Sequence, residues 1–304
     1  MKLTAGSRKS NLALWQARRI QSMLEDHHDG LEVEIIGMDT LGDEIRDRAI
    51  PEIGGKGLFT ERLEKALLLE EIDFAVHSLK DLPSELPEGL TYAGSPRRGT
   101  PTDAFVSFKW ETLKEMPEEA VVATGSRRRR AQLRRYFPSV QLEDLRGNIG
   151  TRLDKLRDRG WDGIIMATTA LERLGRKELV TEQLEPTDFV PAVSQGALGV
   201  EVKEDREDIR ELLDPIWDDD TVAACSAERT FLRILEGGCT VPIGGYCRRE
   251  DGQWAFYGWV GNPTGTSVIE DRMTGSDPEK LAETMANEFI EQGARQLLEA
   301  PVDD

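Results

Sequence analysis

Thr124-Gly-Ser-Arg-Arg-Arg-Arg-Ala-Gln-Leu-Arg-Arg135 is the stretch of sequence from which the fold can be inferred. Ala120-Val-Val-Ala-Thr124, which leads into it, is typical of a short buried strand, and Gly125-Ser126 supplies a turn and a helix N-cap. The arginines therefore open a helix at the end of a strand. At that point free backbone N–H groups and the helix dipole favour an anion, and guanidinium groups add bidentate donors for carboxylate or phosphate.

The arginine run has two interpretations. Six arginines fall within nine residues, in a chain whose formal net charge is −18. An isolated charge run is commonly a solvated helix face. Its place at a strand-to-helix turn of an acidic protein favours the other interpretation, a site for a polyanion.

Composition restricts the class of protein. A chain of 304 residues is long enough for two or three domains. It has no run of about 18 apolar residues, so we expect no membrane span, and the N-terminus lacks a signal-peptide pattern. Three cysteines, Cys225, Cys239 and Cys247, are an odd number without metal-ligand spacing. We therefore expect a reduced cytoplasmic protein without disulfides and without a metal.

The charge balance argues against nucleic acid as a partner. Acidic residues number 57 against 39 basic ones, and only 11 of the basic ones are lysine. A net-negative surface repels a phosphate backbone. High carboxylate content with little lysine is also the composition expected of a protein from a salt-rich cytoplasm.

Strands and helices alternate along the first two thirds of the chain. Apolar patterns predict strands at residues 2–6, 31–35, 73–76, 104–107, 121–124, 141–145 and 163–167, and helices over 11–26 and from about 60. This alternation predicts parallel sheets covered by helices on both faces, with ligands beyond the carboxyl ends of the strands.

The remaining segments differ in character. The glycine-rich stretch 37–57 is too long for an ordinary connection and predicts a lid or a disordered segment. Residues 201–220 carry ten acids and three bases and predict a solvated linker or edge with a helix at 205–213. A helix at 221–236, alternating runs at 253–260 and near 267–269, and a last helix from about 278 predict a small α+β domain.

Chemistry-bearing residues follow the predicted strand ends. Asp81 lies just past a buried strand, where a carboxylate can act as acid or base, stabilise a cation, or simply start a turn. Cys239 lies in a glycine-flanked loop that leaves a thiol accessible, although a single cysteine is more often a small buried hydrophobe. For Cys225 and Cys247 we prefer the interpretation as small buried hydrophobes. His77 is expected to be a buried core residue whose hydrogen bonds are satisfied. Basic and hydroxyl residues complete the set: Arg8, Ser10, Lys80, Arg128, Arg129, Arg146, Arg152 and Arg173.

Six motifs together resemble the porphobilinogen deaminase (hydroxymethylbilane synthase) family of tetrapyrrole biosynthesis. The resemblance runs from Ala5 to about Ala294. The motifs are Ser10-Asn-Leu-Ala-Leu-Trp-Gln-Ala17, Gly54-Gly-Lys-Gly-Leu-Phe59, His77-Ser-Leu-Lys-Asp-Leu-Pro83, Leu145-Arg-Gly-Asn148 with Gly150-Thr-Arg152, Pro191-Ala-Val-Ser-Gln-Gly196 and Leu235-Glu-Gly-Gly-Cys-Thr-Val-Pro-Ile-Gly244.

The resemblance implies an α/β fold with two doubly wound domains of the periplasmic-binding-protein type, which close over a cleft, and a small α+β C-terminal domain. We expect domain 1 at residues 1–97 and 197–216, domain 2 at 98–196 and domain 3, with the cofactor cysteine, at 217–304.

The resemblance also implies a transferase that condenses four porphobilinogen units, with loss of ammonia, into hydroxymethylbilane. The primer is a dipyrromethane cofactor bound by a thioether to Cys239, and we expect a monomer. Asp81 is expected to stabilise the azafulvene cation with help from Lys80. The other implied cofactor-binding residues are Thr124, Ser126, Arg128, Arg129, Arg146 and Gly147, and the substrate-binding residues are Arg8, Ser10, Arg152, Arg173, Gln195 and, at the lid edge, Phe59.

The chain departs from the family pattern at three positions. Gly125 stands where the family usually has a hydroxyl residue. Arg127 stands where the family usually has an apolar residue, and Arg130 where it usually has a neutral polar one. Arg127 and Arg130 are therefore expected to be surface charges.

Two other functions are compatible with parts of the sequence. A non-catalytic two-lobed carboxylate-binding protein would use the arginines but would not need Asp81 or Cys239. An RNA-binding protein would use the run at 127–135, but it would need aromatic side chains among the arginines, and only Tyr136 and Phe137 are near.

The acidic composition predicts that the folded chain gains stability with salt. Mutual repulsion of the carboxylates, strongest around residues 201–220, is screened over about 3 Å at 1 M salt against about 10 Å at 0.1 M. We expect the thermal midpoint to rise from low to molar potassium chloride while turnover falls only modestly. A flat or falling midpoint would contradict the salt-adapted interpretation.

Overall fold

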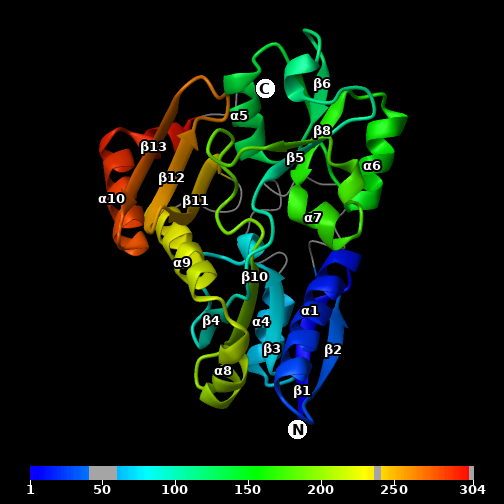
Figure 1. Ribbon diagram of the computed structural model, residues 1–304, viewed down its shortest axis with the longest axis vertical. Coiled ribbons are helices and arrows are strands. Elements are labelled where there is room, and N and C mark those ends of the chain that lie inside the picture. The colour runs from blue at the N-terminus through cyan, green and yellow to red at the C-terminus, as the bar shows by residue number, and fades with distance from the viewer. Residues whose placement is uncertain (41–59, 236–240, 301–304) are drawn as a thin grey trace. The chain divides into compact units, whose positions relative to one another are not determined.

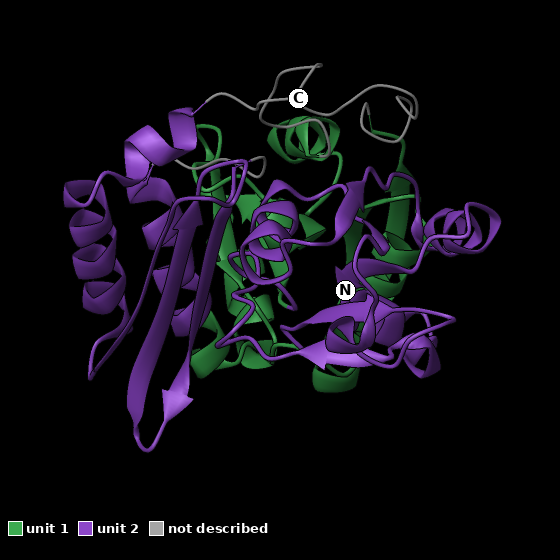
Figure 2. Ribbon diagram, turned by 90° about the horizontal axis from the view of Figure 1, so that it is seen from above, with its two compact units in different colours: residues 1–99, 197–222 green, residues 100–196, 223–304 purple. Residues whose placement is uncertain are grey.

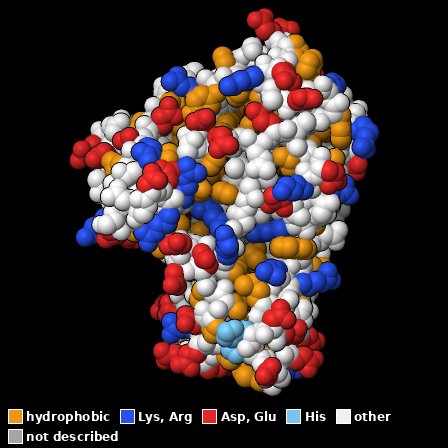
Figure 3. Space-filling model, in the orientation of Figure 1, with side chains coloured by type: hydrophobic (Ala, Val, Ile, Leu, Met, Phe, Trp, Pro, Cys, Tyr) orange, Lys and Arg blue, Asp and Glu red, His pale blue; other side chains and the backbone are white. Residues whose placement is uncertain are grey.

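The computed structural model describes residues 1–40, 60–235 and 241–300. These residues divide into two compact units (Figure 2). Unit 1 consists of residues 1–99 and 197–222, and unit 2 of residues 100–196 and 223–304. Acidic side chains are spread over the visible face, with basic ones among them (Figure 3).

Unit 1 is built on a five-stranded sheet with the order β2-β1-β3-β10-β4 (Figure 1). Strand β1 is parallel to both of its neighbours, whereas β10 is antiparallel to both of its own. The strands are β1 (Lys2–Arg8), β2 (Glu32–Met38), β3 (Phe74–Ser78), β4 (Leu90–Gly94) and β10 (Leu198–Lys203).

Helices cover both faces of this sheet because alternate strand residues point to opposite sides. The apolar stripes of α1 (Asn11–His27) and α8 (Glu207–Leu213) pack on Phe74 and Val76 of β3. Helix α4 (Glu61–Leu68) packs on Ala75, the residue between them. The short 3₁₀ helices η1 (Leu79–Asp81) and η4 (Asp214–Ile216) complete the unit.

Strand β10 corrects the prediction for the acidic stretch. Residues 201–203 belong to an interior strand, not to a solvated linker or edge. Val200 and Val202 are fully buried, and so is Glu201. The acids that follow, around the correctly predicted α8, gave the whole segment its polar appearance.

Unit 2 contains a second five-stranded sheet with the order β7-β6-β8-β5-β9. Strand β6 is parallel to β7 and β8, and β5 is antiparallel to β8 and β9. The elements are β5 (Asp103–Val106), η2 (Leu113–Glu115), β6 (Val121–Ala123), α5 (Arg127–Tyr136), β7 (Gln141–Glu143), α6 (Ile149–Asp158), β8 (Gly163–Ala167), α7 (Thr168–Arg173), η3 (Lys177–Leu179) and β9 (Glu182–Leu184).

The antiparallel strands overturn the expectation of parallel sheets. Each of the two sheets is mixed, because one strand returns in the opposite direction. Helices nevertheless cover both faces of the unit 2 sheet: α6 packs on one core cluster and α5 on the other. The expected α/β class is therefore confirmed, and the carboxyl ends of the parallel strands still share an edge.

The C-terminal part of unit 2 is an antiparallel meander, β11-β12-β13, with three helices. Phe231 of α9 and Phe289 of α10 pack on one face of the meander. Trp259, on the other face, packs with Ala131 of α5. The elements are α9 (Asp219–Ile234), β11 (Ile243–Glu250), β12 (Gln253–Gly261), β13 (Val268–Gly275), α10 (Pro278–Glu291) and α11 (Ala294–Glu299).

Two smaller predictions also have outcomes here. Cys225 and Cys247 are buried, as expected of small hydrophobes. Within the described ranges, no helix is long and apolar enough to cross a membrane.

Candidate functional site

Arg128 and Arg129 share one buried carboxylate, that of Asp103 at the start of β5. Arg128 Nη2 donates to Oδ2 at 2.6 Å. Arg129 donates to Oδ1 from Nε at 2.9 Å and from Nη2 at 2.6 Å. Arg128 also donates to the backbone carbonyl oxygen of Val190 at 2.7 Å. Arg129 also donates to the backbone carbonyl oxygen of Ile165 at 3.2 Å and to Gln195 Oε1 at 3.4 Å.

Burial makes this cluster strongly coupled. Asp103 is 0%, Arg128 3% and Arg129 6% exposed. Burial alone would raise the pKa of Asp103, but the two guanidinium groups and their hydrogen bonds outweigh it and hold that pKa well below its ordinary range. Desolvation lowers the pKa of Arg128, partly offset by Asp103. One carboxylate balances only one of the two cations, so the cluster retains a surplus positive charge.

Local sequence explains how the two arginines reach Asp103. The predicted N-cap is confirmed, since the Ser126 side chain accepts a hydrogen bond from the Arg129 backbone N–H at 3.4 Å. Arg128 and Arg129 therefore lie in the first turn of α5, directly after β6. Arg130, in the same turn, binds the exposed Asp144 at 3.0 Å, consistent with a surface charge.

Gln195 joins the same cluster from the chain that follows Val193. Its side-chain amide donates to Asp103 Oδ1 at 2.9 Å and to the Pro101 carbonyl oxygen at 2.8 Å. The preceding residue, Ser194, has a φ of 60°, in the left-handed region. The Glu228 carboxylate of α9 accepts a hydrogen bond from the Ser194 backbone N–H at 2.6 Å. This contact stabilises an unfavourable backbone conformation and fixes the direction of Gln195.

The other predicted basic residues of unit 2 follow β7 and β8. Arg152 Nε donates to the Gly147 carbonyl oxygen at 2.7 Å, and Arg173 Nη2 donates to that of Gly196 at 2.6 Å. Burial lowers the pKa of Arg173 to about 10, although Glu172 opposes that shift. Arg146 is half-buried, immediately after the buried Leu145.

Two glycines at this edge allow close backbone approaches. Gly147 has a φ of 110°, and a Cβ there would lie 2.8 Å from the Thr151 side chain. A Cβ on Gly125 would lie 2.5 Å from the Leu145 carbonyl oxygen. A side chain at position 125 would therefore require the Leu145 carbonyl group to shift. Thr124, beside it, is fully buried.

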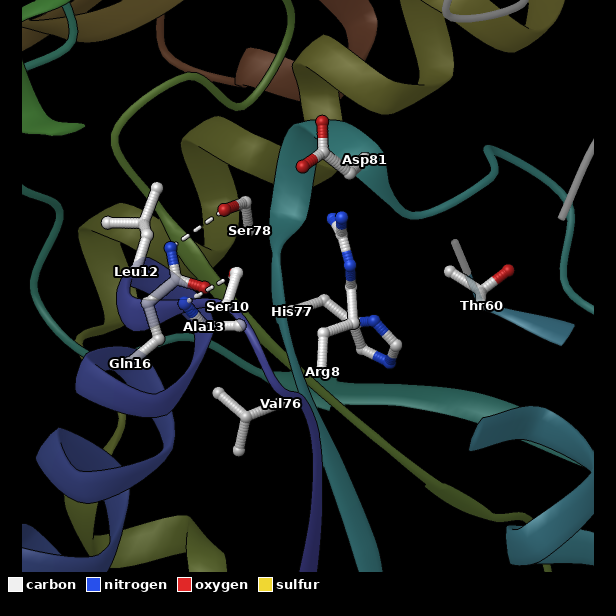
Figure 4. Close-up of a pocket in the computed structure, with 10 residues that line it drawn as sticks. All are labelled: Arg8, Ser10, Leu12, Ala13, Gln16, Thr60, Val76, His77, Ser78 and Asp81. Carbon is white, nitrogen blue, oxygen red and sulfur yellow. Dashed lines mark hydrogen bonds between the residues drawn. The ribbon is translucent and has the colours of Figure 1, made fainter. Parts of the chain in front are cut away.

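In unit 1, predicted residues from separate motifs line one pocket. It has a volume of about 60 Å³ and is lined by Arg8, Ser10 and Asp81, together with Leu12, Ala13, Gln16, Thr60, Val76, His77 and Ser78 (Figure 4). Arg8 ends β1 and Ser78 ends the parallel β3, so the residues that follow these strands meet at one edge. In Figure 4 the guanidinium of Arg8 extends toward the side of the pocket where Asp81 lies.

The polar residues around this pocket have identifiable local roles. Ser10 caps α1 by accepting the Ala13 backbone N–H at 3.3 Å. Gln16, which the sequence did not single out, donates to Ser78 Oγ at 2.7 Å. Asp81 is exposed at the end of η1, and Lys80 beside it is half-buried.

Some predicted residues lie outside the described residues. These are Cys239, Phe59 and most of the glycine-rich stretch. Asp103 was the residue that the sequence interpretation missed. One sequence feature could have indicated it: an acid directly precedes the apolar run Ala104-Phe-Val106 at the start of a predicted strand. A charge buried at such a position needs a partner of opposite charge.

Comparison with known proteins identifies the family. The sequence profile "Porphobilinogen deaminase, dipyromethane cofactor binding domain" matches residues 3–211, and "Porphobilinogen deaminase, C-terminal domain" matches residues 222–291. The chain belongs to the porphobilinogen deaminase family. The enzyme from Chromobacterium violaceum is 44% identical over 301 residues, 98% of this chain and 97% of that protein. The enzyme from Staphylococcus carnosus is 42% identical, and the alignment covers 98% of each chain.

Solved structures of other proteins also align with the chain. The methionine-binding protein MetQ gives a TM-score of 0.42 with 16% identity, covering 72% of this chain and 91% of that one. Lipoprotein Tp32 from Treponema pallidum gives 0.44 with 14% identity, covering 76% and 94%.

Membership of the porphobilinogen deaminase family decides between an enzyme and a non-catalytic carboxylate-binding protein. The chain is an enzyme, a transferase of tetrapyrrole biosynthesis, and the interpretation as a non-catalytic binding protein is wrong. The matched cofactor-binding region includes Arg8, Asp81 and the Asp103 cluster.

The arginine run predicts a contrast between neighbouring substitutions. Arg128→Leu or Arg129→Leu leaves the buried Asp103 partly unpaired, which costs about 3–5 kcal/mol of unfolding free energy. Arg130→Leu removes only a surface pair, worth about 0–1 kcal/mol, and Arg127→Leu should be equally mild. Urea unfolding of the four variants tests this. Equal losses at all four positions would show that bulk positive potential, not pairing with Asp103, is what matters.

Proposed function

We propose that the porphobilinogen deaminase activity of this chain is carried by the pocket of unit 1 and by the basic strand ends of unit 2. The observation that carries this proposal is that Arg8, Ser10 and Asp81, predicted from the ends of two separate strands, line a single pocket. In the reaction four porphobilinogen units are condensed head to tail, each with loss of ammonia, and hydroxymethylbilane is released.

The residues present fit a dipyrromethane group, whose acetate and propionate side chains are anionic. The Asp103 cluster has a surplus positive charge, and Arg128 Nε is a buried donor with no hydrogen-bond partner. A carboxylate is the acceptor that such a donor set favours. By our proposal the thiol of Cys239 holds the group by a thioether. When bound, dipyrromethane supplies the primer to which the pyrrole units are added.

Asp81 has the central role in unit 1 under this proposal. When ammonia leaves porphobilinogen, the remaining carbon framework carries positive charge. A carboxylate in the pocket stabilises that charge more than it stabilises the substrate, and this difference lowers the barrier. Lys80 assists in binding, while Arg8 and Ser10 bind the carboxylates of the pyrrole through ionic and hydroxyl hydrogen bonds.

The unit 2 residues bind carboxylates of the growing pyrrole chain under this proposal. Thr124 and Ser126 contribute hydroxyl or backbone hydrogen bonds at the start of α5, and Gly147 permits a close backbone approach. Gln195 holds Asp103, and through it Arg129, in place. The proposed carboxylate ligands are Arg128, Arg129, Arg146, Arg152 and Arg173, and Phe59 is proposed to border the substrate site.

The remaining expectations are part of the same proposal. We place domain 1 at residues 1–97 and 197–216, domain 2 at 98–196 and domain 3 at 217–304. The two buried thiols fit a reducing compartment, so we propose a cytoplasmic enzyme. We also propose that it acts as a monomer.

The role of Asp81 predicts a selective loss of turnover. Asp81→Ala should keep the fold and the cofactor because the residue is exposed. It should lose about 10²–10³ in rate, since the developing cation loses its counter-charge. Steady-state assays of hydroxymethylbilane formation measure this, and Asp81→Glu, which keeps the charge, is the matched control. Near-normal turnover of Asp81→Ala would make the residue structural.

The role of Cys239 predicts a covalent adduct. Intact-mass measurement of the purified protein should reveal two pyrrole units above the mass of the chain, and Cys239→Ser should lack them. Cys225→Ser, at a buried thiol, is the control that should retain the adduct. An active protein of unmodified mass would contradict the proposal.

A further inference from the structure

Glu228 is a buried carboxylate of unit 2 to which the roles above give no part in the reaction. It belongs to α9 and is 0% exposed. Its Oε2 accepts the backbone N–H of Ser194 at 2.6 Å, and its Oε1 accepts that of Cys247, in β11, at 2.8 Å. One carboxylate therefore holds the backbone of two segments that are far apart in the sequence, and hydrogen bonds to a charged acceptor are strong.

Ser194 occupies an unfavourable position in a tight turn. The Gln195 backbone N–H donates to the Ala192 carbonyl oxygen at 2.9 Å, which closes a turn over residues 192–195. Ser194, the third residue of this turn, has a φ of 60°, whereas the φ of Val193 before it is not positive. This combination is the type II pattern, in which the third position favours glycine because a residue with a Cβ is strained there.

The side chain of Ser194 does not offset this strain. It is fully buried, and its Oγ has no hydrogen-bond partner in the part of the chain that the structure describes. A left-handed backbone and an unpaired buried hydroxyl are both unfavourable. The hydrogen bond from the Ser194 backbone N–H to Glu228 opposes both costs. Without it, Ser194 would relax toward a negative φ and the turn would change shape.

The segment 190–195, which contains this turn, holds both arginines of the Asp103 cluster. The Val190 carbonyl oxygen accepts Arg128 Nη1 at 2.7 Å. The Gln195 side chain donates to Asp103 Oδ1 at 2.9 Å and accepts from Arg129 Nη2 at 3.4 Å. The backbone of this segment therefore helps to determine where both guanidinium groups lie.

We propose that Glu228 is a positioning residue of the deaminase. By holding the 192–195 turn it keeps Gln195 on Asp103, and it thereby keeps the two guanidinium groups directed at carboxylates of the pyrrole chain. It acts through the turn and not by contact with the substrate. The inference rests on the proposed function, which assigns those carboxylates to Arg128 and Arg129.

The first test is Glu228→Gln. The amide preserves the size of the side chain but presents an NH₂ group to one of the two backbone donors, so a hydrogen bond is lost. The KM for porphobilinogen should rise by about tenfold or more, with a smaller change in kcat, because carboxylate binding weakens while the chemical step keeps its groups. A folded variant with the wild-type KM would overturn the proposal.

Glu182→Gln is the matched control. Glu182, in β9 of the same unit, also accepts a backbone N–H through its carboxylate, that of Leu113 at 2.8 Å. This substitution removes the same kind of hydrogen bond at another place, so its kinetic constants should resemble those of the wild type. An equal rise of KM in both variants would mean general destabilisation and would refute a positioning role.

A second substitution, Ser194→Gly, separates positioning from general support of the fold. Glycine adopts a φ of 60° without strain, so it should preserve the turn when the hydrogen bond to Glu228 is lost. The double variant Glu228→Gln, Ser194→Gly should therefore regain most of the wild-type affinity for substrate. If its KM stays as high as that of Glu228→Gln, Glu228 does not act through the turn and the proposal is wrong.

Glu228→Asp covers the case in which Glu228→Gln does not fold. It retains the buried negative charge, but its side chain is one methylene shorter and cannot reach both backbone N–H groups in the same geometry. Its fold is checked by thermal unfolding. Its KM should rise and should fall again when Ser194→Gly is added, and a folded Glu228→Asp with the wild-type KM would contradict the proposal.

Hydrogen exchange supplies a measurement that is independent of activity. In the wild type the Ser194 amide should exchange slowly, and Glu228→Asp should accelerate this exchange whereas Glu182→Gln should not. A wild-type Ser194 amide that exchanges as fast as an unfolded peptide would refute the inference. Wild-type protein that forms no hydroxymethylbilane from porphobilinogen would instead refute the proposed function, so the two failures are distinguishable.

Discussion

Asp103 is the buried carboxylate on which the organisation of unit 2 depends. It is the shared acceptor for two guanidinium groups from the first turn of α5 and for the amide of Gln195. These contacts link the start of β5, the start of α5 and the chain after β9. Removing any one partner would leave charge in a place that water does not reach, so the three segments hold one another in register. The same arrangement fixes guanidinium groups that would otherwise have many rotamers, as the anionic ligand of our proposal requires.

Local patterns were sufficient to predict the elements that surround this carboxylate, but not the carboxylate itself. Ser126 as an N-cap and the arginines at the opening of α5 follow from rules that act within a few residues. The pairing of Asp103 with Arg129 spans 26 residues and depends on β5 entering the sheet antiparallel to β8. Strand alternation cannot give that direction, because a return strand and a parallel strand have the same apolar pattern.

The same limitation explains the misinterpretation of β10. Its residues 198–203 include Glu201 and are followed by a dense run of acids, so composition favoured a solvated segment. In the structure Glu201 is fully buried because His77, on the neighbouring strand β3, binds it. A charge inside an interior strand is stable only with such a partner. That Arg8, Ser10 and Asp81 lie together was more predictable, because they stand at strand ends and the ends of parallel strands meet at one edge.

The two units thus contain buried ionisable groups of different kinds. In unit 2 two guanidinium groups share one carboxylate, which leaves positive charge to be balanced by an anion. In unit 1 Glu201 lies 2.9 Å from the imidazole nitrogen of His77, and burial raises the pKa of the neighbouring Glu64. The substrate of a porphobilinogen deaminase carries carboxylates. Under our proposal the surplus positive charge of unit 2 binds them. A cluster with balanced charge would not, because its groups would already satisfy one another.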